Sequence, residues 1–95
     1  MDNKFYKFFR VEYRLNQKIP FSEISEDIPN IEFIIKDHYL YGFKITINKI
    51  LKESEGEKQI TKESRILTSL LYILSHRHIS LEIIDKQFIE CEGIP

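Results

Sequence analysis

Residues 31–47 read IEFIIKDHYLYGFKITI, an alternating pattern that predicts two β-strands joined by a turn within residues 36–40. A turn centred on His38 sets three apolar pairs on one face of the sheet, which are Ile35 with Tyr41, Phe33 with Phe43 and Ile31 with Ile45. The same register sets Glu32 opposite Lys44 on the other face, whereas a slip by one residue would oppose apolar to polar side chains. We therefore predict a β-hairpin with a loop of three or five residues, and one long bent strand is the alternative.

The segment before the hairpin carries a second alternating pattern. Apolar side chains at odd positions of residues 9–15 alternate with charged ones at Arg10, Glu12 and Arg14, which predicts a half-buried strand over residues 5–15. Tyr6 and Phe8 break the alternation because they place aromatic rings on the charged face. Such rings are either covered by a loop or form an exposed patch that meets a partner or a second copy.

Two polar segments are predicted to connect the main elements. Residues 16–30 contain two prolines, which leave room for one or two helical turns at most, and the acidic part of this segment is the most negative in the chain. Residues 52–62 contain Gly56 and show no apolar period, which predicts an exposed loop.

The apolar period changes near residue 61. Leucine and isoleucine then recur at spacings of three and four, which predicts one long amphipathic helix over residues 61–76 with Thr61 as its N-cap. Residues 79–90 alternate like a strand, although Ser80 could instead cap a second helix and create a helix-turn-helix. We favour the strand. The predicted fold is a single α+β domain over residues 1–95, with a three- or four-stranded, mostly antiparallel sheet packed by one long helix.

Composition narrows the classes of function. The 95 residues include 14 Lys+Arg and 15 Asp+Glu, so the formal net charge of −1 gives no global attraction to nucleic acid or to a membrane surface. We find neither a signal-peptide pattern nor an apolar run near the length of a membrane span, and Cys91 alone makes no internal disulfide. These features predict a cytoplasmic protein. The absence of Ala and Trp, with many Ile and Lys residues, is typical of an AT-rich gene such as one from a phage or mobile element.

No linear motif for catalysis is present. His76 and His78 could ligate a metal from one strand, but no second pair of ligands accompanies them. Glutamates flank Cys91, and their negative charge disfavours a reactive thiolate. We predict no cofactor, no metal and no catalytic residue, and an enzyme is the less favoured class. A small metal-free nuclease using His38, His76 or His78 is the second alternative.

The remaining hypothesis is a binding surface. Charges fall in blocks, with +3 over residues 1–20, −4 over residues 21–35, +3 over residues 36–52 and −3 over residues 79–95. Such patches suit oriented docking to another protein. We predict a small non-enzymatic protein-binding module, an inhibitor, immunity or anti-defence factor, whose partner-binding residues are Tyr6, Phe8, Arg10, Arg14 and Lys44.

Nucleic-acid binding through the same basic, aromatic sheet face is the alternative. The stretch Tyr41-Gly42-Phe43 is similar to a fragment of the aromatic strand motif of RNA-recognition domains, but Lys44 and Thr46 depart from that motif. Homodimerisation is compatible with all three hypotheses, because an exposed edge strand and the additional aromatic residues of the first strand both favour pairing.

Overall fold

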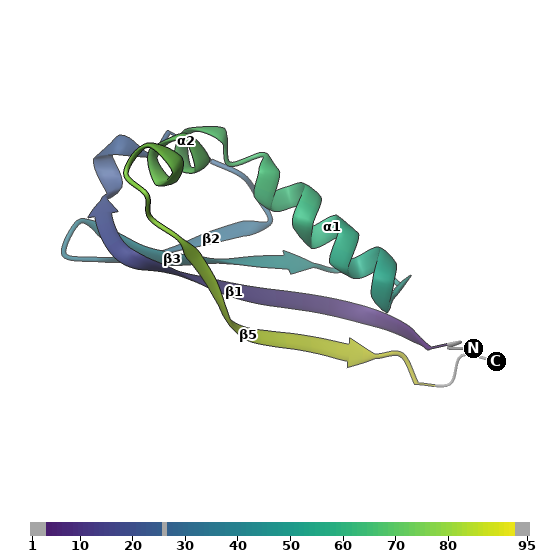
Figure 1. The fold of residues 1–95 in the computed structure, drawn as a ribbon. Coiled ribbons are helices and arrows are strands. Elements are labelled where there is room, and N and C mark those ends of the chain that lie inside the picture. The colour runs from purple at the N-terminus through teal and green to yellow at the C-terminus, as the bar shows by residue number, and fades with distance from the viewer. Residues whose placement is uncertain (1–3, 26, 93–95) are drawn as a thin grey trace.

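The computed structural model describes residues 4–25 and 27–92 and shows an α+β fold (Figure 1). In chain order its elements are β1 (Phe5–Pro20), the 3-10 helix η1 (Phe21–Glu23), β2 (Ile31–Lys36), β3 (Tyr39–Ile47), β4 (Leu51–Lys52), α1 (Glu53–Arg65), α2 (Thr68–His76) and β5 (Leu81–Glu90). Every described strand pair is antiparallel, and the sheet runs β2-β3-β1-β5 with the short β4 beside the start of β1. The predicted α+β class and antiparallel sheet are confirmed, but the sheet has five strands, including the short β4, and not the three or four that were predicted.

The hairpin forms with most of the predicted register. Ile31 lies opposite Ile45, Glu32 opposite Lys44 and Phe33 opposite Phe43. The predicted three- or five-residue loop is wrong, because the turn consists of the two residues Asp37 and His38 at φ 53° and 68°. Two consecutive left-handed residues twist a two-residue turn to match the strands. Because the turn is shorter, the pairing register shifts between Ile34 and Ile35, and Ile35 faces Leu40 instead of Tyr41.

Strand β1 is longer than predicted, since it includes residues 16–20 that were assigned to a connector. Its pairing with β3 breaks after Arg14 and resumes where Ile19 faces Leu40. Both of these side chains are buried, which explains why the strand continues toward Pro20. The rest of the connector contains the single turn η1, and Glu26 lies outside the described residues.

Helix α1 shows that two of the predictions are wrong. The predicted loop over residues 52–62 is mostly helix, and the predicted helix over residues 61–76 is two helices separated at Ile66 and Leu67. Helix α1 buries only Gly56 and Ile60, so the sequence shows little apolar period, while its many Glu and Lys residues favour a helix. Thr61 lies inside α1, where its hydroxyl donates to the carbonyl oxygen of Glu57, and it is not an N-cap.

The segment after α2 is the strand β5, as predicted, which rules out the helix-turn-helix alternative. Strand β5 lies antiparallel to β1, with Phe88 opposite Phe9 and Leu81 opposite Leu15. The chain therefore returns from the helices to the sheet beside its first strand.

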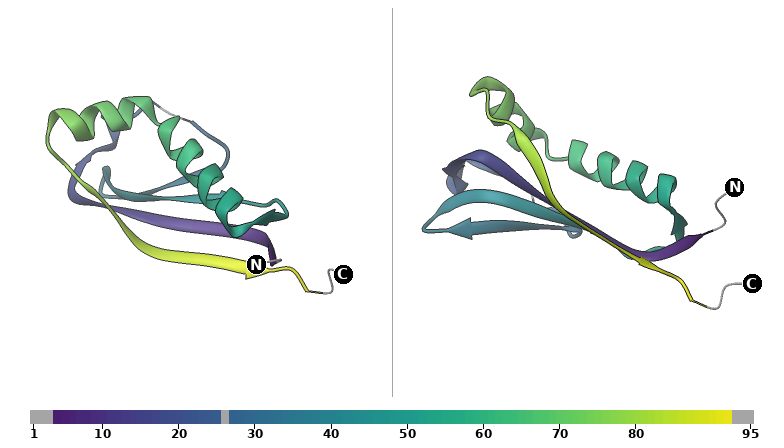
Figure 2. Two further views of the ribbon diagram at one scale, coloured as in Figure 1. Left: turned by 45° about the vertical axis from the view of Figure 1, so that its right-hand side comes forward. Right: turned by 60° about the horizontal axis from the view of Figure 1, so that its bottom comes forward.

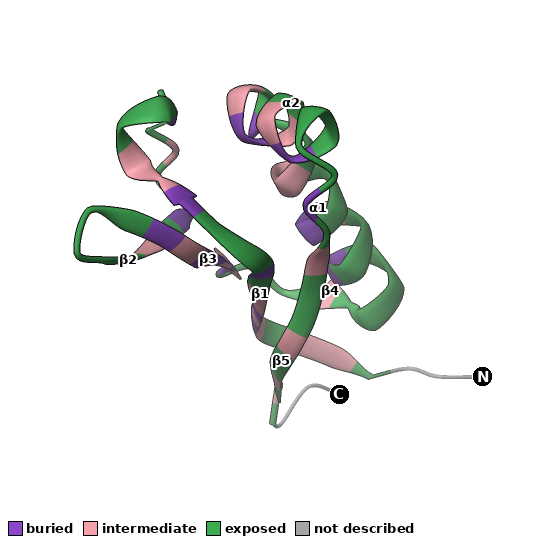
Figure 3. Cartoon of the chain, turned by 60° about the vertical axis from the view of Figure 1, so that its left-hand side comes forward, coloured by how far each residue is buried: buried purple, intermediate pink, exposed green. Residues whose placement is uncertain are grey.

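The core lies between the helices and one face of the sheet (Figure 2). Alternate residues of β1, β2 and β3 point toward the helices and are buried there, among them Phe9, Val11, Ile31, Phe43, Ile45 and Ile47. Leu67, Leu70 and Leu74 meet them from the helical layer. Figure 3 shows the consequence, because burial concentrates between the sheet and the helices while β5 is largely exposed or intermediate. We call this face of the sheet the helix side.

Gly56 allows α1 to approach the sheet closely. A Cβ at this position would fall among the Cδ1, Cε1 and Cζ atoms of the Phe9 ring, which is fully buried. The ring also packs edge-on against Phe88, with their centroids 4.9 Å apart, so it has little room to move. The glycine that resembles a loop signal in the sequence is thus the contact point between helix and sheet.

Gly56→Ala is expected to lower the free energy of unfolding by about 1–3 kcal/mol, the usual cost of overpacking a core. At an open helical position the same change would stabilise the protein by about 0.5–1 kcal/mol, because alanine favours the helix. Urea denaturation measures the effect, with Ser54→Ala on the exposed side of α1 as control. In a Phe9→Leu background, where the smaller side chain leaves room, the loss should shrink. An equal loss in both backgrounds would show that the Phe9 contact is not its cause.

Candidate functional site

One entire face of the sheet carries no helix in the described part of the chain, and we call it the bare face (Figures 1 and 2). Antiparallel partners point to the same side of a sheet, so the strand registers identify its side chains. They are Phe8, Arg10, Glu12 and Arg14 of β1, Glu32 and Ile34 of β2, Lys44 and Thr46 of β3, and Glu82, Asp85, Gln87 and Ile89 of β5. None of them is buried. The bare face is therefore a continuous accessible surface across four strands.

Phe8 and Arg10 form one end of the bare face together with Ile89. The guanidinium carbon of Arg10 lies 5.2 Å from the centroid of the Phe8 ring, a cation–π contact between side chains two residues apart on β1. Ile89 lies opposite Phe8 and is 40% exposed. The Nε of Arg10 is buried and has no hydrogen-bond partner among the described residues. This end thus combines exposed apolar area with a guanidinium that retains an unused donor, a combination typical of interface anchors.

The middle of the bare face is a field of charges that the fold leaves unpaired. One row across the sheet contains Asp85, Glu12, Lys44 and Glu32, and the next row sets Arg14 opposite Glu82. The ion pairs formed within the described residues, Arg77 with Glu23 and Lys86 with Glu57, both lie elsewhere. Together with Arg10 at the end of the face, seven charged side chains, four acidic and three basic, therefore lie on this accessible surface. Opposite charges so interleaved give the face a pattern that a partner can complement.

A hollow of about 260 Å³ lies at the other end of the bare face, above Gly42. It is lined by Glu12, Arg14, Ile34 and Tyr41, and by Tyr13, whose backbone carbonyl lies next to Gly42. The hollow exists because Gly42 has no side chain, and a Cβ there would collide with the carbonyl oxygen of Tyr13. Aromatic, aliphatic and charged groups around one recess can accept an apolar side chain and fix its orientation.

Four of the five predicted partner-binding residues, Phe8, Arg10, Arg14 and Lys44, lie on the bare face. Tyr6 does not. Its ring lies on the helix side, 5.8 Å from the Phe9 centroid and 6.0 Å from the Phe88 centroid. The cause is a register shift between Tyr6 and Phe8, because one extra residue in β1 turns the strand's start over.

Sequence reasoning missed the hollow and the acidic side chains that β5 adds to the bare face. Ile34 was assigned only to the hairpin, Tyr41 and Gly42 to the hairpin and to a motif fragment, and Glu82 and Asp85 only to the last strand. The hairpin register already placed Ile34 near Gly42, but the hollow depends on β1 lying next to β3, which the sequence does not specify.

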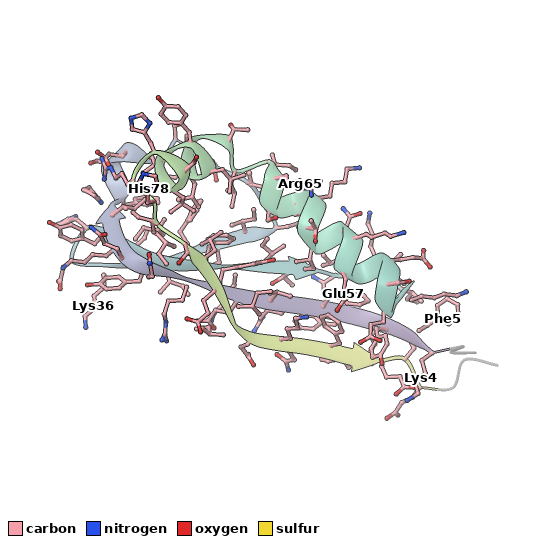
Figure 4. All side chains as sticks on the ribbon, viewed as in Figure 1. Lys4, Phe5, Lys36, Glu57, Arg65 and His78 are labelled. Atoms are coloured by element: carbon pink, nitrogen blue, oxygen red, sulfur yellow. The ribbon has the colours of Figure 1, made fainter. Side chains whose placement is uncertain are left out.

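The remaining titratable candidates stay apart from the bare face. Tyr13 points to the helix side, where it stacks on Phe43 at 4.9 Å and burial raises the pKa of its hydroxyl above the usual value. His76 stacks on Tyr72 of α2, and His38 belongs to the hairpin turn. His78, labelled in Figure 4, follows α2 at a positive φ of 55°. Among the described residues, no three His, Cys, Asp or Glu side chains gather as metal ligands would.

Comparisons with known proteins assign neither a family nor a function to the chain. Compared with models of known protein families, with curated proteins and with solved structures, the chain shows no significant match in any of the three. In the part of the chain that the structure describes, neither helix has the length and apolar character needed to cross a bilayer. The geometry of the bare face is therefore the basis for a functional proposal.

Proposed function

We propose that this chain is a small non-enzymatic protein-binding module whose partner docks on the bare face. The observation that carries the proposal is the set of seven charges on that face, which the fold leaves without ion-pair partners among the described residues. A partner with complementary charges would gain specificity and orientation from them. Phe8 with Arg10 at one end and the hollow above Gly42 at the other would supply the anchors. An inhibitory or immunity role would be one use of such docking.

The distribution of charge favours a protein partner over nucleic acid. Arg10, Arg14 and Lys44 are the basic groups of the bare face, and four acidic side chains lie in the rows beside them. Phosphates approaching this face would meet as much repulsion as attraction, because binding to nucleic acid depends on a surplus of Lys and Arg. A protein surface can place an acidic group opposite each basic side chain and a basic group opposite each acidic one.

The test is affinity capture from the native host with three matched baits: wild type, the bare-face variant Arg10→Ala, Arg14→Ala, Lys44→Ala, and a control variant. The control replaces the same number of basic residues on the exposed side of α1, namely Lys58→Ala, Lys62→Ala and Arg65→Ala. Partner affinity is then measured for each bait by calorimetry, and thermal unfolding checks that all three are folded.

We expect the bare-face variant to lose at least about 30-fold in partner affinity, the effect of removing one interface hot spot, while the control binds like wild type. Retention of the partner by the bare-face variant would refute the proposal. Capture that disappears on nuclease treatment and weakens steeply with salt would instead establish the nucleic-acid alternative.

A further inference from the structure

The second surface that the fold leaves open is the outer edge of β5. Strand β5 pairs with β1 along one side, and on its other side no strand lies within the described residues. Along this ten-residue strand, alternate residues therefore present unpaired N–H and C=O groups, which favour the addition of another strand. The opposite edge of the sheet, β2, is shorter, with six residues.

The second half of β5 is the regular part of this edge. A register shift against β1 falls at Ile84, which has no partner on β1 and separates residues 81–83 from the second half of the strand. From Asp85 onward the alternation is regular up to Ile89, with Lys86 and Phe88 on the helix side and Gln87 and Ile89 on the bare face. Glu90 faces Tyr6 and belongs to the helix side as well. An added strand would pair best with this half, because its ladder positions are evenly spaced.

A second copy of the same chain is the occupant that this half of β5 fits. A two-fold axis perpendicular to the sheet makes β5 antiparallel to its copy and keeps the helix side of both copies on the same side. An axis at Asp85 or Lys86 would set like charges directly opposite each other, which is destabilising. An axis at Phe88 sets Lys86 opposite Glu90 of the second copy, and this opposite-charge pair occurs twice by symmetry.

We propose that the protein forms a homodimer in which β5 pairs with β5 of a second copy, centred on Phe88. The pairing joins two five-stranded sheets into one and leaves both bare faces free, so it is independent of the proposed docking function. Lys86 already forms an ion pair with Glu57 at 3.5 Å, but both side chains are half exposed, so a second carboxylate can still approach the ammonium. Figure 4 shows Glu57 on α1, above this part of the sheet.

The dimer should also enlarge a groove on the helix side. Helix α1 covers β1 and β3, and between α1 and β5 remains an open groove of about 170 Å³ lined by Val11, Ile60, Ile83 and Phe88, among others. Pairing of β5 with its copy would bring two such grooves next to each other across the axis. Only about five residues of each copy would pair, so the interface should be smaller than the standard area of roughly 800 Å² per partner. The dimer should therefore dissociate on dilution.

Sedimentation equilibrium tests the proposal with variants in which the charge of Lys86 or Glu90 is reversed. Lys86→Glu and Glu90→Lys each set like charges opposite one another twice, and each is expected to weaken the dimer at least about 10-fold. The double variant Lys86→Glu, Glu90→Lys restores opposite charges and should dimerise like wild type. Lys58→Glu and Glu55→Lys on α1 make the same changes of net charge away from β5 and serve as controls.

Loading concentrations should extend to about 1 mM, because interfaces of this size associate weakly. A wild-type protein that stays monomeric over that range overturns the proposal. A dimer that is indifferent to the single changes, or that the double variant fails to restore, shows that another surface or register is used and overturns it as well. In support, amide resonances that shift on dilution should map to residues 85–90.

Discussion

Phe9→Ala is expected to lower the free energy of unfolding by about 3–5 kcal/mol, the range found when a buried phenylalanine is truncated. Phe9 is fully buried and contacts the rings of Tyr6 and Phe88, and α1 rests on it at Gly56. Its removal opens a cavity between sheet and helix that this packed cluster cannot close. Since domains of this size have only about 5–15 kcal/mol of stability, the loss is a large part of the total.

The matched control for this prediction is the preceding residue. Phe8→Ala removes an identical side chain from the bare face, where it contacts Arg10 and is not buried, so its cost should stay well below that of Phe9→Ala. Urea denaturation followed by circular dichroism measures both. Should Phe9→Ala fail to fold, Phe9→Leu and Phe8→Leu provide the same comparison with smaller effects. Equal losses at the two positions would contradict the assignment of faces in β1.

Gly42→Ala is expected to lower the free energy of unfolding by about 2–3 kcal/mol, at the upper end of the usual overpacking range. The added methyl would meet the carbonyl oxygen of Tyr13 and would lie 3.2 Å from its carbon and 3.3 Å from the Cα of Arg14. These are backbone atoms of a strand paired on both sides, so they cannot move aside as the end of a side chain can. The two strands would have to separate locally.

Thr46→Ala is the control for Gly42→Ala, because residue 46 lies on the same strand and the same face. Its cost should be within about 0.5 kcal/mol, as for most accessible positions. The same urea titration decides the comparison. If Gly42→Ala were as mild as Thr46→Ala, β1 and β3 would not approach as closely as the structure shows.

The elements that sequence predicted well are those whose apolar side chains alternate along a strand. The hairpin register follows from apolar pairs such as Phe33 with Phe43, because a slip would expose one partner of each pair. The strand at β5 follows from the alternation of residues 79–83. One side of the hairpin is buried, whereas no apolar side chain within β5 is fully buried.

The elements that sequence predicted poorly depend on contacts with residues that are distant in the sequence. Helix α1 buries only two residues, so no apolar stripe reveals it, and Gly56 resembles a loop signal while serving a contact with Phe9. The division between α1 and α2 at Leu67 has no breaker residue, and Leu67 itself is fully buried against the core. Tyr6 was assigned to the wrong face because a bulge depends on pairing between strands distant in sequence.

The alternation along β1 determines which of its positions can be substituted without loss of the fold. Odd-numbered positions such as Phe9 and Val11 are buried in the core, while even-numbered ones such as Arg10, Glu12 and Arg14 form no ion pair within the described residues. The even positions can therefore be varied as a set at little cost to folding. A library randomised there would alter what the surface recognises while the scaffold stays constant, so stability and recognition can be selected separately on one strand.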